Sequence, residues 1–140
     1  MRLLFILLTI SLVGCDTKTT ELTTDKNVQS ENFDDFFNKF KSDSLFQMER
    51  VKFPLTLVTW DLDDNLATEE ISRENWRYLR LEYKNEFGTR EIDAYTQEIK
   101  IYADSAKLEL RGVDNGIHVD YVFNKVNGQW TLTTERDYSN

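Results

Sequence analysis

The 140-residue chain has a single cysteine, a single histidine and a single proline, and these scarcities argue against several classes of protein. One cysteine cannot close an internal disulfide, and one cysteine with one histidine cannot supply the usual ligands of a structural zinc site. Acidic residues number 25 against 17 lysines and arginines, and both signs are interspersed along the chain. Without a basic stripe, a nucleic-acid partner is not expected.

No apolar run is long enough to span a membrane, and the run Leu3–Val13 has only eleven residues. It follows Met1 and Arg2, which is the arrangement of a secretory signal. The run ends on "LVGC" (Leu12–Cys15), which resembles the lipobox of bacterial lipoproteins, whose cysteine is acylated and becomes the new N-terminus. The sequence therefore predicts a signal peptide over residues 1–14 and lipidation of Cys15. The alternative is an uncleaved or ordinary secretory signal.

A polar segment follows the cysteine. Residues 16–32 contain five threonines, two isolated aliphatic residues and no aromatic residue, a composition that cannot bury enough apolar surface to fold. We therefore expect the lipidated cysteine and a flexible tether over residues 15–32, followed by a single domain over residues 33–140.

The domain begins with an amphipathic pattern. Phe33, Phe36, Phe37 and Phe40 follow the spacing of one helix face, and Asn32 precedes them as an N-cap candidate. The phenylalanine stripe predicts a helix packed on a sheet, and "DSLFQMER" (residues 43–50) predicts a short second helix.

The C-terminal half predicts a four-stranded antiparallel meander over residues 97–137. Two-residue turns at 127–128, 115–116 and 104–105 give one register, in which Tyr121 faces Thr134 and Leu110 faces Tyr121. This register places a set of apolar residues on one face: Ile99, Ile101, Leu108, Leu110, Val119, Tyr121, Phe123, Trp130 and Leu132. The opposite face carries charges that meet across strands: Glu98, Arg111, Asp120 and Glu135, with Lys100 beside Glu109.

Two further strands are expected upstream. One is the β-branched and aromatic run at residues 53–61, and the other is the alternating run at residues 75–83. The polar stretch at residues 62–74 is expected to hold a turn and a helical piece. Together these elements predict an α+β fold, in which N-terminal helices pack on one face of a curved antiparallel sheet.

The stretches "FDDFFNKFKSDSLFQMERVKFPL" (residues 33–55) and "VNGQWTL" (residues 126–132) resemble a family of uncharacterised lipoproteins of Gram-negative bacteria. That family is a domain of unknown function within the nuclear transport factor 2-like, or cystatin-like, superfamily. The resemblance implies a cone-like curved sheet whose concave side holds helices and often a pocket. It carries no catalytic residue to this chain, and superfamily members include both enzymes and non-enzymes.

The residues themselves offer little catalytic chemistry. Asp61, Asp63 and Asn65 match the first positions of a calcium loop, but Leu66 and Ser72 replace its required glycine and glutamate. In the derived register the only histidine, His118, lies with Asp120 on the polar face, where a solvent-exposed role is expected. We therefore predict no catalytic residue, no metal and no cofactor.

These observations favour a non-catalytic lipoprotein of the Gram-negative cell envelope, anchored to the inner or outer membrane through Cys15. It is expected to bind a protein, peptide or glycan partner. The alternative is a protein that binds a small apolar ligand on the concave side, or an isomerase-like or dehydratase-like enzyme that uses this side. The candidate pocket lining is aromatic: Trp60, Trp76, Tyr78, Tyr121 and Trp130.

Overall fold

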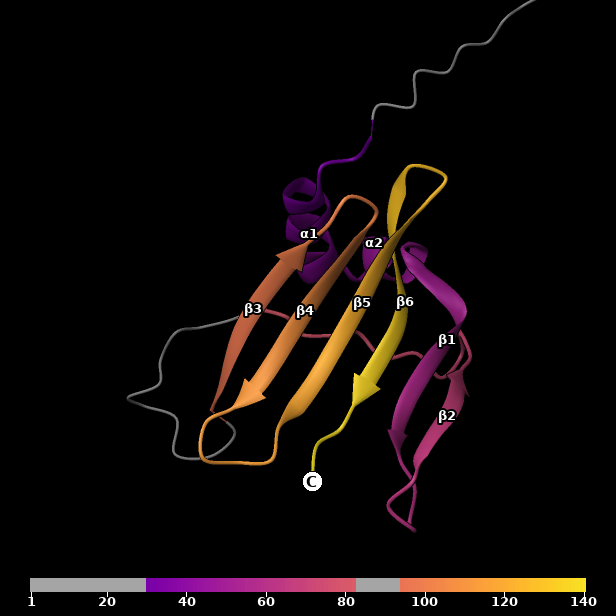
Figure 1. Cartoon of the computed structure of the whole chain (residues 1–140). Coiled ribbons are helices and arrows are strands. Elements are labelled where there is room, and N and C mark those ends of the chain that lie inside the picture. Colours follow the sequence, from indigo (N-terminus) through magenta and orange to yellow (C-terminus); the bar gives the residue numbers. More distant parts are fainter. Residues whose placement is uncertain (1–29, 83–93) are drawn as a thin grey trace, which may run out of the picture.

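Two helices lie against one face of a six-stranded sheet in the computed structural model of the chain, which describes residues 30–82 and 94–140 (Figure 1). The elements in chain order are α1 (Phe33–Ser42), α2 (Ser44–Glu49), β1 (Val51–Trp60), β2 (Leu66–Ile71), β3 (Tyr95–Ile101), β4 (Ser105–Gly112), β5 (His118–Val126) and β6 (Gln129–Asp137). The strand order is β2-β1-β6-β5-β4-β3, and only the β1–β6 pair is parallel. The α+β prediction, with helices on one face of a curved sheet, is confirmed.

Both predicted helices are present, and their caps explain their boundaries. The side chain of Asn32 accepts a hydrogen bond from the Asp35 amide at 3.1 Å, and the carboxylate of Asp43 accepts from the amides of Leu45 and Phe46. These oxygens satisfy amides that a helix N-terminus leaves unpaired. Neither helix, nor any other within residues 30–82 and 94–140, is long and apolar enough to cross a membrane.

An aromatic core fixes the helices on the sheet. The ring of Phe123, on β5, meets the rings of four phenylalanines of α1 near perpendicular, at centroid distances of 5.3–6.2 Å. These are Phe33, Phe36, Phe37 and Phe40. Trp130 of β6 adds an edge-on contact with Phe33 at 5.0 Å. Edge-to-face geometry is the favourable arrangement for such rings, so the predicted helix stripe is confirmed as core.

The described chain begins with a second point of attachment. Glu31 receives two hydrogen bonds from the Arg50 guanidinium, at 2.8 and 3.0 Å, and one from the Trp130 amide at 2.7 Å. The Trp130 indole also donates to the Glu31 carbonyl. The last residues of the predicted tether therefore contact the domain, while residues 1–29, with Cys15, lie outside the described residues.

The first of the two predicted upstream strands is present as β1, but the second is not where it was predicted. The second one is β2 (Leu66–Ile71), which lies in the polar stretch where a helical piece was predicted, and no strand is found at residues 75–82. Asp61 stabilises the tight turn between β1 and β2, because its carboxylate accepts hydrogen bonds from the Asp63 and Asn65 amides. The alternation at Leu79 and Leu81 reflects packing on the core rather than a place in the sheet. Residue 83 lies outside the described residues.

The meander is confirmed, but two of its three hairpins have a different register. The Asn127–Gly128 turn forms as predicted, with positive φ at both residues. In the other two hairpins each residue faces a partner two positions away from the predicted one. Leu110 faces Val119, and Ile99 faces Leu108. A shift of two residues keeps every side chain on its face, and the predicted apolar face therefore stands.

An irregularity in the β5–β6 pair changes which residues of β6 lie on each face of the sheet. Val122 pairs with Thr134 and Phe123 with Leu132, which leaves Thr133 as an extra residue, a β-bulge, in β6. The register between β1 and β6 also shifts at this level, between Val51 and Thr56. Beyond the bulge Glu135 lies opposite Tyr121, so the predicted position of Glu135 on the polar face is wrong. We call the side of the sheet that carries the helices the helix face and the opposite side the outer face.

Candidate functional site

Beyond the bulge, the helix face changes from apolar to polar. Glu135 and Asp137 are two residues apart on β6, on the same side of the strand as Tyr121 and Val119, which lie opposite them. Leu57 and Thr59 of β1 are their register partners on the other side. Tyr121, Glu135 and Asp137 are called the polar cluster from here on.

Burial perturbs the titration of the polar cluster. Burial raises the pKa of Tyr121 above its ordinary value, and the negative charges of Glu135 and Asp137 add to this effect. Burial also raises the pKa of Glu135, and the charge of Asp137 raises it further, while a hydrogen bond from Tyr121 acts in the opposite direction. Glu135 therefore holds a proton more readily than an exposed glutamate does.

The polar cluster can accept hydrogen bonds and can bind or release a proton. It offers carboxylate oxygens as hydrogen-bond acceptors, beside the apolar side chains of Leu57 and Val119, and a carboxyl group that can change protonation state. A bound cation would relieve the repulsion between Glu135 and Asp137. Across the residues that the structure describes, no group of three or more His, Cys, Asp or Glu side chains is arranged to hold a metal ion.

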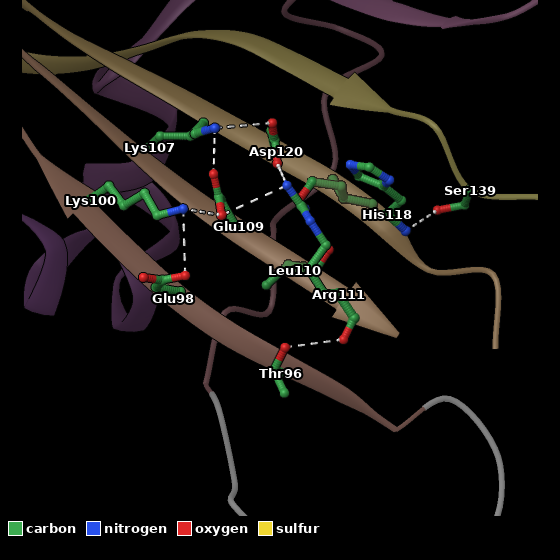
Figure 2. A network of polar contacts seen from close by, with 11 residues as sticks. Thr96, Glu98, Lys100, Lys107, Glu109, Leu110, Arg111, His118, Asp120 and Ser139 are labelled. Atoms are coloured by element: carbon green, nitrogen blue, oxygen red, sulfur yellow. Dashed lines mark hydrogen bonds and ion pairs between the residues drawn. The ribbon is translucent and has the colours of Figure 1, made fainter. Parts of the chain in front are cut away.

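The outer face carries a network of charges, which Figure 2 shows. Glu109 lies between Lys100, at 2.8 Å, and Lys107, while Asp120 pairs with Arg111 at 2.6 Å. Hydrogen bonds from Lys100 and Lys107 lower the pKa of Glu109 to about 2. The predicted proximity of Lys100 and Glu109 is confirmed, and each buried carboxylate is matched by cations, as in a structural network.

His118 lies at the end of this network, across from Arg111. Its backbone amide donates to the Ser139 hydroxyl at 3.0 Å, and its ring meets Tyr138 edge-on at 5.4 Å. Asp120 is on the same face, but its carboxylate is engaged by Arg111. Asp137 lies on the helix face, so the structure does not bring it to His118 on the outer face.

The five aromatic residues predicted to line a pocket lie in different places. Trp60 is exposed at the end of β1 near Tyr138, Trp76 packs edge-on against Phe53, and Trp130 is buried under α1. Tyr78 is exposed and donates a hydrogen bond to the Lys41 carbonyl. Of the five, Tyr121 alone belongs to the polar cluster.

Sequence reasoning missed Glu135 and Asp137, although one signal was present. A regular hairpin from the Asn127–Gly128 turn places Glu135 opposite Asp120, and like charges directly across strands are unfavourable. The bulge places Arg136 opposite Asp120 instead. The charge conflict is a sign of this bulge, although a like-charged pair elsewhere in the sheet, Glu98 opposite Glu109, is accommodated without one.

A groove lies elsewhere on the molecule, between α1 and β3. Its volume is about 440 Å³. The described residues that line it are Asp34, Phe37, Asn38, Lys41, Leu81, Gln97 and Ile99. The Gln97 side-chain oxygen is buried and has no hydrogen-bond partner among the described residues.

Comparison with known proteins agrees with this architecture. A family described as a domain of unknown function (DUF4348) matches residues 14–137. No curated protein matches the chain.

Two solved structures from Bacteroides are similar. The crystal structure of an NTF2-like protein from Bacteroides fragilis NCTC 9343 has 24% identity and a TM-score of 0.59, and it covers 80% of this chain. This chain spans only 49% of that protein. The NMR structure of a protein from Bacteroides uniformis ATCC 8492 has 27% identity, a TM-score of 0.56 and 76% coverage of each chain. The fold is therefore NTF2-like, as the resemblance implied.

Proposed function

We propose that this chain, which belongs to the DUF4348 family, binds a small amine-bearing ligand at the polar cluster on the helix face of its sheet. The observation that carries the proposal is the placement of Glu135 and Asp137 beside Tyr121, on the same face as the core. The NTF2-like fold is one that can bind ligands.

The negative charges of Glu135 and Asp137 favour an amine as the ligand. Two carboxyl groups on alternate residues of one strand face are roughly 7 Å apart at the backbone, and the charge of Asp137 opposes the ionisation of Glu135. Such an arrangement costs stability, and proteins retain such costs mainly where a function requires them. An ammonium group between the carboxylates removes the repulsion, and Leu57 and Val119 offer contact to an apolar body.

We expect the purified protein to bind phenethylammonium more tightly than its neutral analogue phenethyl alcohol, because only the amine neutralises the two carboxylates. Asp137→Asn is expected to weaken amine binding at least tenfold, as measured by calorimetry or by NMR titration. Glu70→Gln is the matched control, since it removes the same charge from an exposed position of β2. Equal binding of amine and alcohol would refute the proposal.

The pH dependence gives a second measurement in the same experiment. Because the pKa of Glu135 is raised, a bound cation displaces its proton, so amine affinity should rise with pH through the titration of Glu135. Without ligand, the free energy of unfolding should fall as pH rises from 4.5, the ordinary pKa of a glutamate, through the raised pKa of Glu135. The reason is that Glu135 ionises less readily in the folded state than in the unfolded state. Glu135→Gln is expected to flatten both profiles. A variant that keeps the profiles of the wild type would show that another group titrates.

Acid–base catalysis is a second candidate function at the same residues. It is favoured by the raised pKa of Glu135 beside the Tyr121 hydroxyl, since a carboxyl group that titrates nearer to neutral pH can transfer protons. Recovery of the ligand chemically unchanged after prolonged incubation would support binding alone.

The place of action is a further part of the proposal. The chain is held by lipid on Cys15 at a membrane of the Gram-negative cell envelope, where a protein, peptide or glycan partner is also within reach. The support is the apolar run that ends on Leu12–Cys15 and the polar residues between Cys15 and Ser30, whose hydroxyl accepts a hydrogen bond from Lys125 at 2.6 Å. About fifteen residues of flexible chain would separate membrane and domain by roughly 20 Å.

Cys15→Ala is expected to move the protein from the membrane fraction to the soluble fraction, because the acyl chains supply the membrane affinity. Immunoblots of fractionated cells measure this change, and Thr17→Ala is the control within the tether. Mass spectrometry of the wild type should find an acylated N-terminus at Cys15. Recovery of a chain with Met1 and a free thiol would refute the anchor.

A further inference from the structure

Among the strands that the structure describes, β3 lies at one edge of the sheet and has β4 as its one neighbour. The hydrogen bonds from Tyr102 N to Ser105 O and from Val113 N to Ala94 O show which main-chain groups face β4. In an antiparallel pair this orientation alternates, so the even-numbered residues of β3 bond to β4. The N–H and C=O groups of Gln97, Ile99 and Ile101 therefore point away from the sheet.

We propose that β3 pairs with β3 of a second copy of this chain, antiparallel, with Ile99 on the twofold axis. In this register Ile99 meets the other Ile99 as a hydrogen-bonded pair, and Gln97 meets Ile101. Both are residues whose main-chain groups point outward, so the hydrogen-bond pattern of the two edges is compatible. The two sheets become one continuous sheet of twelve strands.

Charge complementarity supports a second copy as the partner. Figure 2 shows Glu98 and Lys100 on the outer face of β3, and their side chains lie 3.5 Å apart within one chain. With Ile99 on the axis, Glu98 of each copy lies directly opposite Lys100 of the other. Two favourable cross-strand pairs result, which is the arrangement that stabilises antiparallel strands.

The other edge of the sheet, β2, does not have charges that are complementary to a second copy of itself. β2 (Leu66–Ile71) carries Glu69 and Glu70 and no basic residue. An antiparallel pair of β2 strands centred on these residues would bring carboxylates together, which is destabilising. Acidic residues of this kind protect an edge from pairing, so the sheet is blocked at β2 and complementary to itself at β3.

Apolar surface accompanies the β3 edge. Ile99 and Ile101 are 38% and 50% exposed, and Tyr102 next to them is 59% exposed. Ile99 also lines the groove between α1 and β3, with Phe37 and Leu81. In the proposed dimer the isoleucines of the two copies cover one another on the helix face, and the burial of this surface adds to the main-chain hydrogen bonds.

Cysteine cross-linking tests the register. In a Cys15→Ser background, Ile99→Cys should form a disulfide-linked dimer under mild oxidation, because the two Cα atoms of such a pair are about 5.5 Å apart. Ile101→Cys is the matched control, since it is more exposed but is separated from its counterpart by about 14 Å. Equal cross-linking of both variants, or of neither, would refute the register.

Charge reversal tests the pairing itself. Glu98→Lys places lysine opposite lysine twice and is expected to weaken the dimer roughly tenfold in sedimentation velocity. Glu70→Lys makes the same charge change on the β2 edge and should leave the dimer unchanged. Thermal unfolding of both variants controls for folding, because both glutamates are exposed. A wild-type chain that sediments as a monomer at 200 µM would overturn the proposal.

Discussion

Phe123→Ala is expected to lower the free energy of unfolding by about 4 kcal/mol, because the side chain is fully buried and contacts four phenylalanine rings of α1. The removed ring leaves a cavity between β5 and the helix that rigid aromatic neighbours cannot fill. Chemical denaturation followed by tryptophan fluorescence measures the loss. For a domain of this size the loss is a large fraction of the total stability.

The control for this variant is Tyr102→Ala, which removes an aromatic ring from an exposed position. It should change the free energy of unfolding by less than about 0.5 kcal/mol. A loss below 2 kcal/mol for Phe123→Ala would contradict the structure, because it would mean that the four rings of α1 do not depend on Phe123.

Gln47→Leu is expected to destabilise the fold by about 3 kcal/mol, although leucine has a similar volume and is more apolar. The Gln47 side chain is fully buried, donates to the carbonyls of Phe40 and Leu79, and accepts from the Leu79 amide at 2.7 Å. Leucine leaves these main-chain groups without partners inside the protein, and the cost of an unpaired buried group exceeds the gain in apolar contact.

Equilibrium denaturation measures this effect, and hydrogen exchange locates it. The Leu79 amide should exchange much faster in the variant, because Gln47 holds the segment after β2 against the helices. Glu49→Leu, at an exposed position of α2, is the control and should have little effect. A Gln47→Leu protein of unchanged stability would show that the Leu79 segment finds other partners.

Elements with local signals could be predicted from the sequence. The phenylalanine spacing, Asn32 and the charges at its ends identify α1, and Asn127–Gly128 identifies one hairpin with its first pairs. The other two hairpins contain loops of a different length, which set the register but not the faces. The apolar face of the sheet was therefore correct even where the pairs were not.

The candidate site depends on features that are not local. The alternation of Leu79 and Leu81 looks like that of a strand, but the partner of this segment is a glutamine more than thirty residues away. The sequence predicts Glu135 on the polar face because regular alternation continues through Thr133, and only the paired strand reveals the extra residue. Short-range patterns cannot detect such an insertion, except through the charge conflict at Asp120.

The bulge at Thr133 and the shift between β1 and β6 occur at the same level and divide the helix face into two halves. Aromatic packing of α1 against Phe123 and Trp130 lies in one half, and Tyr121, Glu135 and Asp137 lie in the other. A substitution of Glu135 or Asp137 removes no side chain from the aromatic core, whereas Tyr121 belongs to the buried core itself. The division therefore allows the residues proposed to bind ligand to be changed separately from those that hold α1 on the sheet.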